Sequence, residues 1–322
     1  LLDVKDLKTY FYTDSGVAKA VDGVTFSVDK GKVLGIVGES GCGKSVTSLS
    51  IMRLVDPVTG KNEGGEILFD GTDILKLPEL EMRKLRGNRI SMIFQDALTA
   101  LNPVMTIGKQ MDEIYRCHEK ISKKEAKMRS IKALKAVGIP DAELRYHAFP
   151  HELSGGMRQR VLIAMAFACE PEVIIADEPT TALDVTIQAQ ILELLSKMQK
   201  EKQTALLLIT HDLSVVRSMA DRIAVMYSGK IVEEAPAKEL LENPLHPYTK
   251  GLMAAVARLD DDKKEFVQIP GHLPDPADKP AGCYFHPRCP YAATACKKAM
   301  PLLTQNQQGR KVRCYEAGKF KE

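Results

Sequence analysis

The sequence predicts an α/β fold followed by a loop-rich C-terminal segment, on three observations. Between Leu162 and Met226, short apolar runs alternate with helical stretches, the pattern of a parallel sheet with crossover helices. Near the N-terminus, an apolar strand leads into a glycine-rich loop and then into a helix expected to begin near Lys44. Beyond Gly229, proline, glycine and aromatic residues become frequent, which indicates loops and a domain boundary near 235–260.

The elements follow in order along the chain. The segment AVDGVTFSVDKGKVLGIVG reads as strands, and the stretch from Asp73 to Ala148 reads as polar helices. Its charged run HEKISKKEAKMRS is interpreted as a solvated helix face rather than a binding patch. The runs VIIAD, ALLLIT and RIAVM are expected to be buried strands. We find no internal repeat, so one copy of the strand–loop–helix unit is encoded.

Composition restricts the class of protein. The 322 residues include 45 basic and 42 acidic side chains, and a net charge of +3 is far from that of a dedicated nucleic-acid binder. The nearly uncharged apolar stretches, Val161–Cys169 and Thr204–Thr210, are too short to cross a bilayer. The first residues, LLDVKDLKTY, carry charges where a signal peptide has an apolar core. We therefore expect a cytoplasmic protein that binds no nucleic acid.

The octapeptide GESGCGKS, which spans Gly38 to Ser45, matches the phosphate-loop pattern G-x-x-x-x-G-K-[ST]. It follows the strand VLGIV and precedes a helix, so backbone N–H groups and the helix N-terminus can face phosphates. Lys44 would supply a point charge and Ser45 an oxygen ligand for Mg²⁺. The alternative is a glycine-rich turn with an accidental lysine. The residues expected at the nucleotide are Gly38, Ser40, Gly41, Cys42, Gly43, Lys44, Ser45 and Val46, with the Cys42 thiol inert.

Two carboxylates, Asp177 and Glu178, follow the apolar run VIIA. A pair of this kind is usually structural when it stands alone. After a phosphate loop, however, it predicts that Asp177 holds Mg²⁺ through water and that Glu178 polarises the attacking water as general base. The sequence therefore predicts hydrolysis of MgATP.

The segment LSGGMRQR, from Leu153 to Arg160, resembles the LSGGQ signature of ABC-type ATPases, with Met157 in place of the usual glutamine. Further motifs of that family match in order: Gln95 in MIFQDALTALNP as the Q-loop, Ala182-Leu183-Asp184 as the D-loop, and His211 in LLITHD as the switch histidine. The resemblance implies a P-loop, RecA-like core with an antiparallel β subdomain and a helical subdomain at about 98–160. It also implies a head-to-tail dimer in which Ser154, Gly155 and Gly156 cap the γ-phosphate held by the opposite subunit.

The resemblance assigns further roles. Gln95 would be a ligand of Mg²⁺ and water that also senses the membrane subunit, although a surface amide is the simpler interpretation. His211 would contact the γ-phosphate, although a histidine after a buried strand is more often structural. Tyr10, Phe11 and Tyr12 all compete to stack on adenine, and the family pattern favours Phe11.

The chain also resembles, over essentially its whole length, the ATP-binding subunits of dipeptide and oligopeptide importers, through AVDGVTFSV, FQDALTALNP and NPLHPYT. This implies an ATPase domain at 1–240, an importer-type extension at 241–322, and a position at the cytoplasmic face of the inner membrane. The expected partners are two permeases, a second ATPase, either a paralogue or the same chain, and indirectly a substrate-binding protein. Peptides are the expected cargo, with nickel, opines or sugar oligomers as alternatives.

A soluble ABC ATPase of DNA repair or translation is the rival interpretation. Such proteins typically carry two cassettes or a long coiled-coil insertion, and the sequence contains neither.

Four cysteines crowd into the C-terminal segment with the spacing C-x5-C-x6-C-x17-C: Cys283, Cys289, Cys296 and Cys314. Four thiolates could hold a [4Fe-4S] cluster or a zinc ion. The spacing lacks the C-x2-C pairs of zinc ribbons, and Pro290 directly follows Cys289, so we expect the cluster, as the resemblance to peptide-importer ATPases also implies. Zinc with His286 as a ligand and unligated thiols are the alternatives, and a structural and a redox role both stay open.

Overall fold

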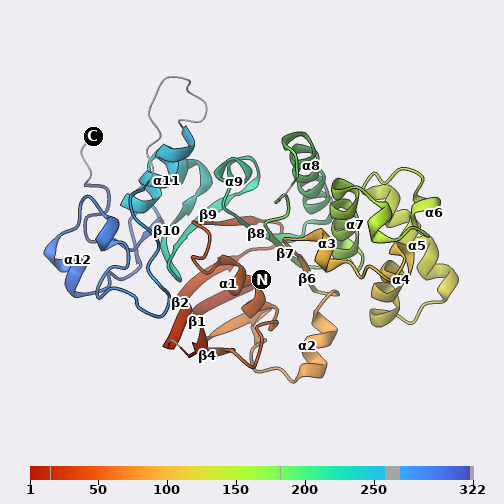
Figure 1. Ribbon diagram of the computed structural model, residues 1–322, viewed down its shortest axis with the longest axis horizontal. Helices are drawn as coiled ribbons and strands as arrows, with labels where there is room; N and C mark the ends of the chain where they lie inside the picture. The colour runs from red at the N-terminus through yellow and green to blue at the C-terminus, as the bar shows by residue number, and fades with distance from the viewer. Residues whose placement is uncertain (15, 182, 258–268, 320–322) are drawn as a thin grey trace. The chain divides into compact units, whose positions relative to one another are not determined.

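A computed structural model describes residues 1–14, 16–181, 183–257 and 269–319 (Figure 1). The chain divides into two compact units. Unit 1 comprises Leu1–Val28, Val33–Leu75 and Ile209–Glu322, and unit 2 comprises Asp29–Lys32 and Lys76–Leu208. Both units combine strands with helices, which confirms the predicted α/β class.

Unit 1 contains an antiparallel sheet in the order β2-β1-β4-β5. In β1, Leu2, Val4 and Leu7 are buried while intervening residues are exposed or partly exposed, as expected for a sheet with one covered face. Helix α1 contacts β1 and β2. The strands and the helix, drawn in red to orange in Figure 1, are β1 (Leu2–Thr13), β2 (Gly16–Val28), β4 (Gly60–Phe69), β5 (Thr72–Asp73) and α1 (Lys44–Ile51).

A second group of strands in unit 1 has the order β11-β12-β10-β9-β3. Strand β3 is buried throughout and runs parallel to β9, whereas the other neighbours are antiparallel. Helix α9 (Leu213–Met219) packs against β3 at Gly35, where an added Cβ would lie 2.6 Å from a methyl carbon of Val216. The strands are β3 (Val33–Val37), β9 (Arg222–Tyr227), β10 (Lys230–Pro236), β11 (Thr304–Gln305) and β12 (Lys311–Val312).

The chain after Gly229 has more regular structure than its composition predicts. Strand β10 and the helices α10 (Ala237–Glu242) and α11 (Pro247–Ala257) follow directly. Residues 269–319, which we call the tail segment, contain only short elements: a 3₁₀ turn at His286–Arg288, α12 (Thr294–Lys298), β11 and β12. Their packing relies on an aromatic cluster of Tyr227, Tyr248 and Phe285 rather than on periodic apolar runs. Contacts between distant parts of the chain produce no periodic pattern in the local sequence, so these elements could not be predicted from it.

Unit 2 contains parallel strands β6 (Ile90–Ile93) and β7 (Val173–Asp177), with β8 (Ala205–Thr210) as the next strand after β7. Helix α7 contacts β6, α3, α4, α5 and α8, so it lies at the centre of this unit. Its helices are α2 (Glu79–Leu85), α3 (Ala97–Ala100), α4 (Ile107–His118), α5 (Lys123–Ala136), α6 (Ala142–Arg145), α7 (Gly155–Phe167) and α8 (Val185–Lys202). A 3₁₀ turn at Pro150–Glu152 precedes α7.

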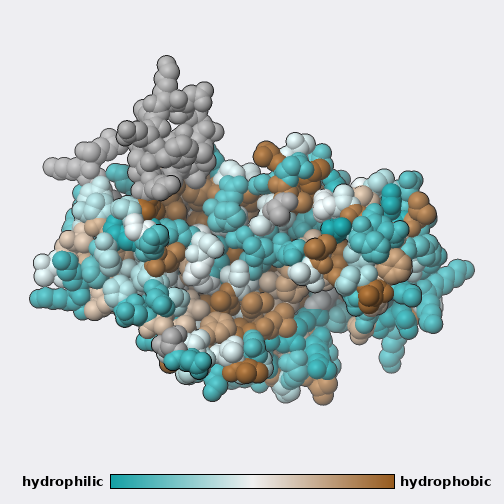
Figure 2. Space-filling view, viewed as in Figure 1, coloured by the Kyte–Doolittle hydropathy of each residue, from teal (hydrophilic) through white to brown (hydrophobic). Residues whose placement is uncertain are grey.

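The surface of unit 2 is predominantly polar over its helices α4 to α6 on the face that Figure 2 shows. Exposed large apolar residues of this unit, such as Val104 and Leu144, are isolated rather than arranged in long runs. Within the described part of the chain, none of the helices has the length and apolar character that a bilayer crossing requires.

Candidate functional site

The loop Gly38–Gly43 joins the buried strand β3 to helix α1, which begins at Lys44, as the motif predicts. Gly41 and Gly43 have φ values of 80° and 107°, which L side chains rarely adopt. An added Cβ would lie 2.4 Å from the Ala20 carbonyl oxygen at Gly43 and 2.2 Å from that of Met226 at Gly38. Glycine is therefore required at Gly38 and Gly43 by close backbone neighbours.

Lys44, the first residue of α1, is buried, and its ammonium group donates back to the loop carbonyl oxygens of Gly38 at 2.8 Å and Glu39 at 3.1 Å. These are loop carbonyls, so the charge is held at the loop where the motif would place a phosphate. Burial raises the pKa of the neighbouring Cys42 thiol, so this side chain stays protonated. Ser45 and Val46 are the next two residues of α1, and both are half-buried.

The predicted carboxylates lie at the end of β7. Asp177 is the last residue of the strand and is buried, and Glu178 follows with a φ of 46°, which is uncommon for a residue with a side chain. The Glu178 carboxylate accepts hydrogen bonds from the Gln95 side-chain amide and from the Thr181 hydroxyl, both at 2.9 Å.

Gln95 reaches Glu178 because it follows β6, which pairs in parallel with β7, so the two strands end at the same edge. The structure thus brings together two side chains that the sequence places far apart. Thr181 was not predicted. Its position three residues after Glu178, within a turn whose backbone hydrogen bond joins the same two residues, is the signal that could have found it.

The signature segment forms the start of α7. The Ser154 hydroxyl oxygen accepts from the Met157 backbone N–H at 3.3 Å, which makes Ser154 the N-cap. Gly155 and Gly156 form the first turn, and an added Cβ on Gly156 would lie 2.8 Å from a methyl carbon of Ile187.

The predicted D-loop residue Asp184 is the N-cap of α8, because its carboxylate accepts from the Ile187 backbone N–H at 2.9 Å. Together with the contact between Gly156 and Ile187, this places the first turns of α7 and α8 side by side. Leu183 lies 3.6 Å from the position of an added Cβ on Gly155. Ala182, the first residue of the expected D-loop, lies outside the described residues.

The remaining expected residues belong to unit 1. His211 directly follows β8 and is exposed. Among the aromatic candidates for adenine, the hydroxyls of Tyr10 and Tyr12 donate to Asp22 and Glu63, at 2.9 and 2.7 Å. Phe11 is half-buried and packs at Gly60. The expected site residues thus fall into two sets: the phosphate loop, Phe11 and His211 in unit 1, and the remainder of the nucleotide motifs in unit 2.

The expected [4Fe-4S] cluster is wrong, and the zinc alternative is not supported. Among the residues that the structure describes, no group of three or more histidine, cysteine, aspartate or glutamate side chains is placed to hold a metal ion. Burial raises the pKa of Cys283, of Cys289 and of Cys314, the last to about 12. The four cysteines line a cavity of only about 10 Å³. His286 directs its Nδ1 to the Cys283 carbonyl oxygen, 2.9 Å away.

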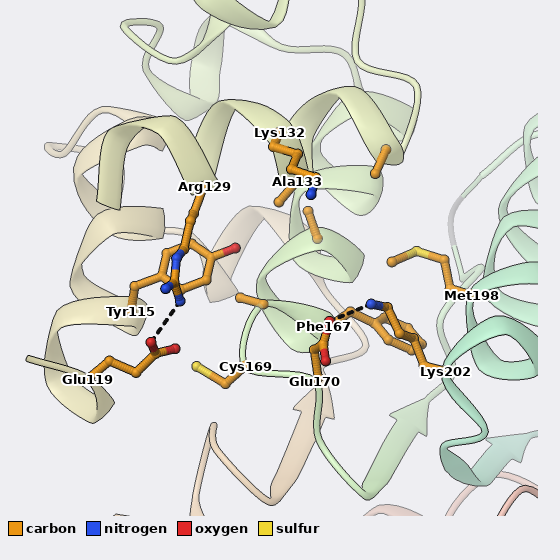
Figure 3. A pocket seen from close by; sticks show the side chains of 13 residues that line it. Tyr115, Glu119, Arg129, Lys132, Ala133, Phe167, Cys169, Glu170, Met198 and Lys202 are labelled. Carbon is orange, nitrogen blue, oxygen red and sulfur yellow. Dashed lines mark hydrogen bonds and ion pairs between the residues drawn. The ribbon is translucent and has the colours of Figure 1, made fainter. Parts of the chain in front are cut away.

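A cavity of about 490 Å³ lies among α4, α5, α7 and α8 of unit 2 (Figure 3). Arg129 extends beside the Tyr115 ring and pairs with Glu119 at 2.7 Å, and Lys202 pairs with Glu170. None of the lining residues belongs to a predicted nucleotide motif. We therefore assign this cavity no part in nucleotide chemistry.

Comparisons with known proteins agree with the motifs. Residues 21–181 match the family described as ABC transporter, and residues 232–296 match the one described as oligopeptide/dipeptide transporter, C-terminal region. The oligopeptide transport ATP-binding protein AppD of Bacillus subtilis (strain 168) is 49% identical over 315 residues, which cover 98% of this chain and 96% of AppD. A probable peptide ABC transporter ATP-binding protein, y4tR of Sinorhizobium fredii, is 50% identical over 318 residues, which cover 98% and 95% of the two chains.

Among solved structures, the dimeric post-hydrolysis state of the ATP-binding cassette MJ0796 bound to ADP and Pi is similar, with a TM-score of 0.66 and 28% identity. The match covers 74% of this chain and 99% of that one. With the phosphate loop, the carboxylates after β7 and the signature turn of α7 all present, the chain belongs to the ABC transporter family of ATPases, within the group of peptide, dipeptide and oligopeptide transport ATP-binding proteins.

Proposed function

We propose that this protein is the ATP-hydrolysing subunit of an importer for dipeptides or oligopeptides. The main support for ATP hydrolysis is the loop between β3 and α1. Close backbone neighbours require glycine there, and the Lys44 ammonium donates hydrogen bonds to two loop carbonyl oxygens. Such a loop with a helix N-terminus behind it suits the anionic phosphates of ATP. The peptide cargo is supported by the match of residues 232–296 and by the names of the relatives.

We propose the following roles in hydrolysis. Lys44 contacts the β- and γ-phosphates, and Ser45, Gln95 and Asp177 contribute to the Mg²⁺ site, where the ion would neutralise phosphate charge. Glu178 accepts a proton from the attacking water, and Gln95 holds that carboxylate in place. Phe11 stacks on adenine and His211 contacts the γ-phosphate, as the family resemblance implies.

We further propose that the signature residues Ser154, Gly155 and Gly156 act on the nucleotide held by a second ATPase subunit. The start of α7 offers backbone N–H groups, two small residues and a positive dipole end, which suit a phosphate. Asp184 caps α8 beside this turn and would therefore hold the surface that faces the partner. The dimeric state named for the MJ0796 structure supports this arrangement.

In this proposal, residues 1–240 form the ATPase domain, with a helical subdomain at about 98–160, and residues 241–322 form the importer-type extension. The protein works at the cytoplasmic face of the inner membrane with two permeases, a second ATPase and, indirectly, a substrate-binding protein. Nickel, opines and sugar oligomers are the alternative cargoes.

The decisive experiment reconstitutes the protein with its permeases and binding protein in lipid vesicles. ATP hydrolysis and uptake of labelled peptide are measured together for a series of peptides and for Ni²⁺, with Lys44→Ala as the inactive control. Peptide-dependent stimulation of both signals supports the proposal. If only Ni²⁺ stimulates hydrolysis, the cargo is nickel rather than peptide, and the proposed ATPase activity still stands.

A further inference from the structure

The tail segment reaches the phosphate loop through an ion pair. The Arg288 guanidinium faces the Glu39 carboxylate with both ends, at 3.0 Å from Nη1 to Oε2 and 3.2 Å from Nη2 to Oε1. The Arg288 side chain is only 7% exposed, and that of Glu39 is 27% exposed. A forked, mostly buried pair of this kind fixes geometry far better than a surface ion pair does.

The backbone of Glu39 is held from the same direction. Its N–H donates to the Tyr248 hydroxyl at 2.9 Å. Tyr248 is buried against Tyr227 and Phe285, with ring centroids 4.6 and 5.4 Å away. Residues from α11 and from the tail segment therefore hold both the main chain and the side chain of the second residue of the loop.

Arg288 is itself fixed in place. Its Nε donates to the Pro270 carbonyl oxygen at 2.8 Å, and the guanidinium carbon lies 5.8 Å from the centre of the Tyr227 ring. The guanidinium is thus held by contacts with the tail segment and with β9 in addition to its ion pair with the loop. This arrangement makes it a fixed element rather than a flexible surface charge.

The position of Glu39 bears directly on Lys44. The Glu39 carbonyl oxygen accepts from the Lys44 ammonium at 3.1 Å, so a shift of this residue moves a contact of the lysine. A released Glu39 carboxylate would also add a negative charge beside a site for phosphates, which repels them. Arg288 both neutralises this carboxylate and keeps it turned toward the tail segment.

We propose that Arg288 is a positioning residue for nucleotide binding: it holds Glu39 so that the phosphate loop and Lys44 keep the arrangement that accepts phosphates. The packing of the tail segment thereby sets the affinity of the loop for ATP. This inference rests on the proposed role of the phosphate loop.

The test measures the Kd for MgADP and the KM and kcat for MgATP with the full-length chain. Arg288→Gln is expected to weaken MgADP binding about tenfold, which corresponds to about 1.4 kcal/mol. The KM should rise by a similar factor while kcat at saturating MgATP stays within about twofold. Arg288→Lys restores the charge without the fork and should recover part of the affinity.

A double-mutant cycle separates positioning from a general packing defect. In a Glu39→Gln background the carboxylate is absent, so Arg288→Gln should cause little further loss of affinity. Arg313→Gln is the matched control, because Arg313 is also an arginine of the tail segment but donates to the carbonyl oxygens of Ile231 and Pro301 rather than to the loop. This control should leave the Kd within about twofold of that of the unchanged protein.

Two results would overturn the inference: an unchanged Kd in Arg288→Gln, or an equal loss in the presence and absence of the Glu39 carboxylate. If Arg288→Gln does not fold, the two charges are exchanged instead. Glu39→Arg places two cations together and must weaken MgADP binding, and adding Arg288→Glu to that variant must restore it. Lys44→Ala tells a failure of this inference from a failure of the proposed function. If Lys44→Ala binds MgADP with unchanged affinity, the phosphate-loop assignment itself is wrong. If Lys44→Ala loses affinity for MgADP and Arg288→Gln does not, only the role of Arg288 is wrong.

Discussion

The side-chain amide of Gln95 donates a hydrogen bond to the Glu178 carboxylate, with 2.9 Å between Nε2 and Oε2. The two residues follow neighbouring parallel strands, β6 and β7. The same carboxylate oxygen accepts from Thr181. Two side-chain donors thus hold one oxygen of the Glu178 carboxylate in place.

We predict that Glu178→Gln keeps ATP binding and lowers kcat by at least about a hundredfold, because an amide accepts no proton from water. Binding of MgATP and phosphate release measured on one preparation check this prediction. Thr181→Val is the matched control, since it removes one hydrogen bond to Glu178 and leaves the carboxylate. Turnover of Glu178→Gln within a few-fold of that of the unchanged protein would contradict the role of general base.

We predict that Gly43→Ala abolishes nucleotide binding, because the new Cβ would lie 2.4 Å from the Ala20 carbonyl oxygen at a φ of 107°. The backbone on both sides would have to move, and the loop would lose its shape. Gly41→Ala is the matched control: its φ is 80°, but no atom lies within 4 Å of the added carbon. It should cost only about 1 kcal/mol of local strain. Comparable MgADP affinities for the two variants, measured by calorimetry, would show that the steric argument fails.

The sequence was sufficient where function depends on short, contiguous motifs. The phosphate loop, the strand before Asp177 and the helix that begins after Ser154 were all predicted at the positions where they are found. These elements are local, since glycine positions, an apolar run and an N-cap serine each determine the backbone nearby.

The tail segment was harder to predict for the opposite reason. Its core joins Phe285 to Tyr227 and Tyr248, and the pair of Arg310 and Glu233 joins it to β10. No spacing in the sequence encodes these contacts between distant residues. The crowded cysteines suggested a metal that would hold the segment together, whereas the structure shows aromatic packing and buried ion pairs.

We predict that activity requires two subunits with complementary parts of the site. Ser154→Arg and Lys44→Ala should each be inactive alone, the first because a bulky cation blocks the start of α7 and the second because a phosphate contact is lost. Mixed in equal amounts, the two variants should regain one working composite site per mixed dimer. Phosphate release measured against protein concentration checks this, and a mixture that stays inactive while the two variants demonstrably associate would contradict action across the dimer.

We predict that His246 makes the protein sensitive to acid. Burial lowers the pKa of His246 to about 3 from its ordinary value of 6.5. Its Nδ1 accepts from the Tyr248 backbone N–H at 3.1 Å, which requires the neutral ring. The unfolded chain therefore binds a proton between these pH values that the folded chain does not. The stabilisation is fully present above pH 6.5 and is lost as the pH falls toward 3, by about 1.4 kcal/mol per pH unit.

The variant His246→Asn isolates this contribution, because its Oδ1 can accept the same hydrogen bond without titrating. Its unfolding free energy should depend less on pH between 6.5 and 4.5 than that of the unchanged protein, as urea unfolding at each pH would show. His147→Asn is the control, since His147 is exposed. The Glu233 carboxylate, which accepts from the His246 backbone N–H at 2.9 Å, is present in all three proteins and cancels in the comparison. Parallel pH profiles for His246→Asn and the unchanged protein would show that the buried imidazole does not set the acid limit.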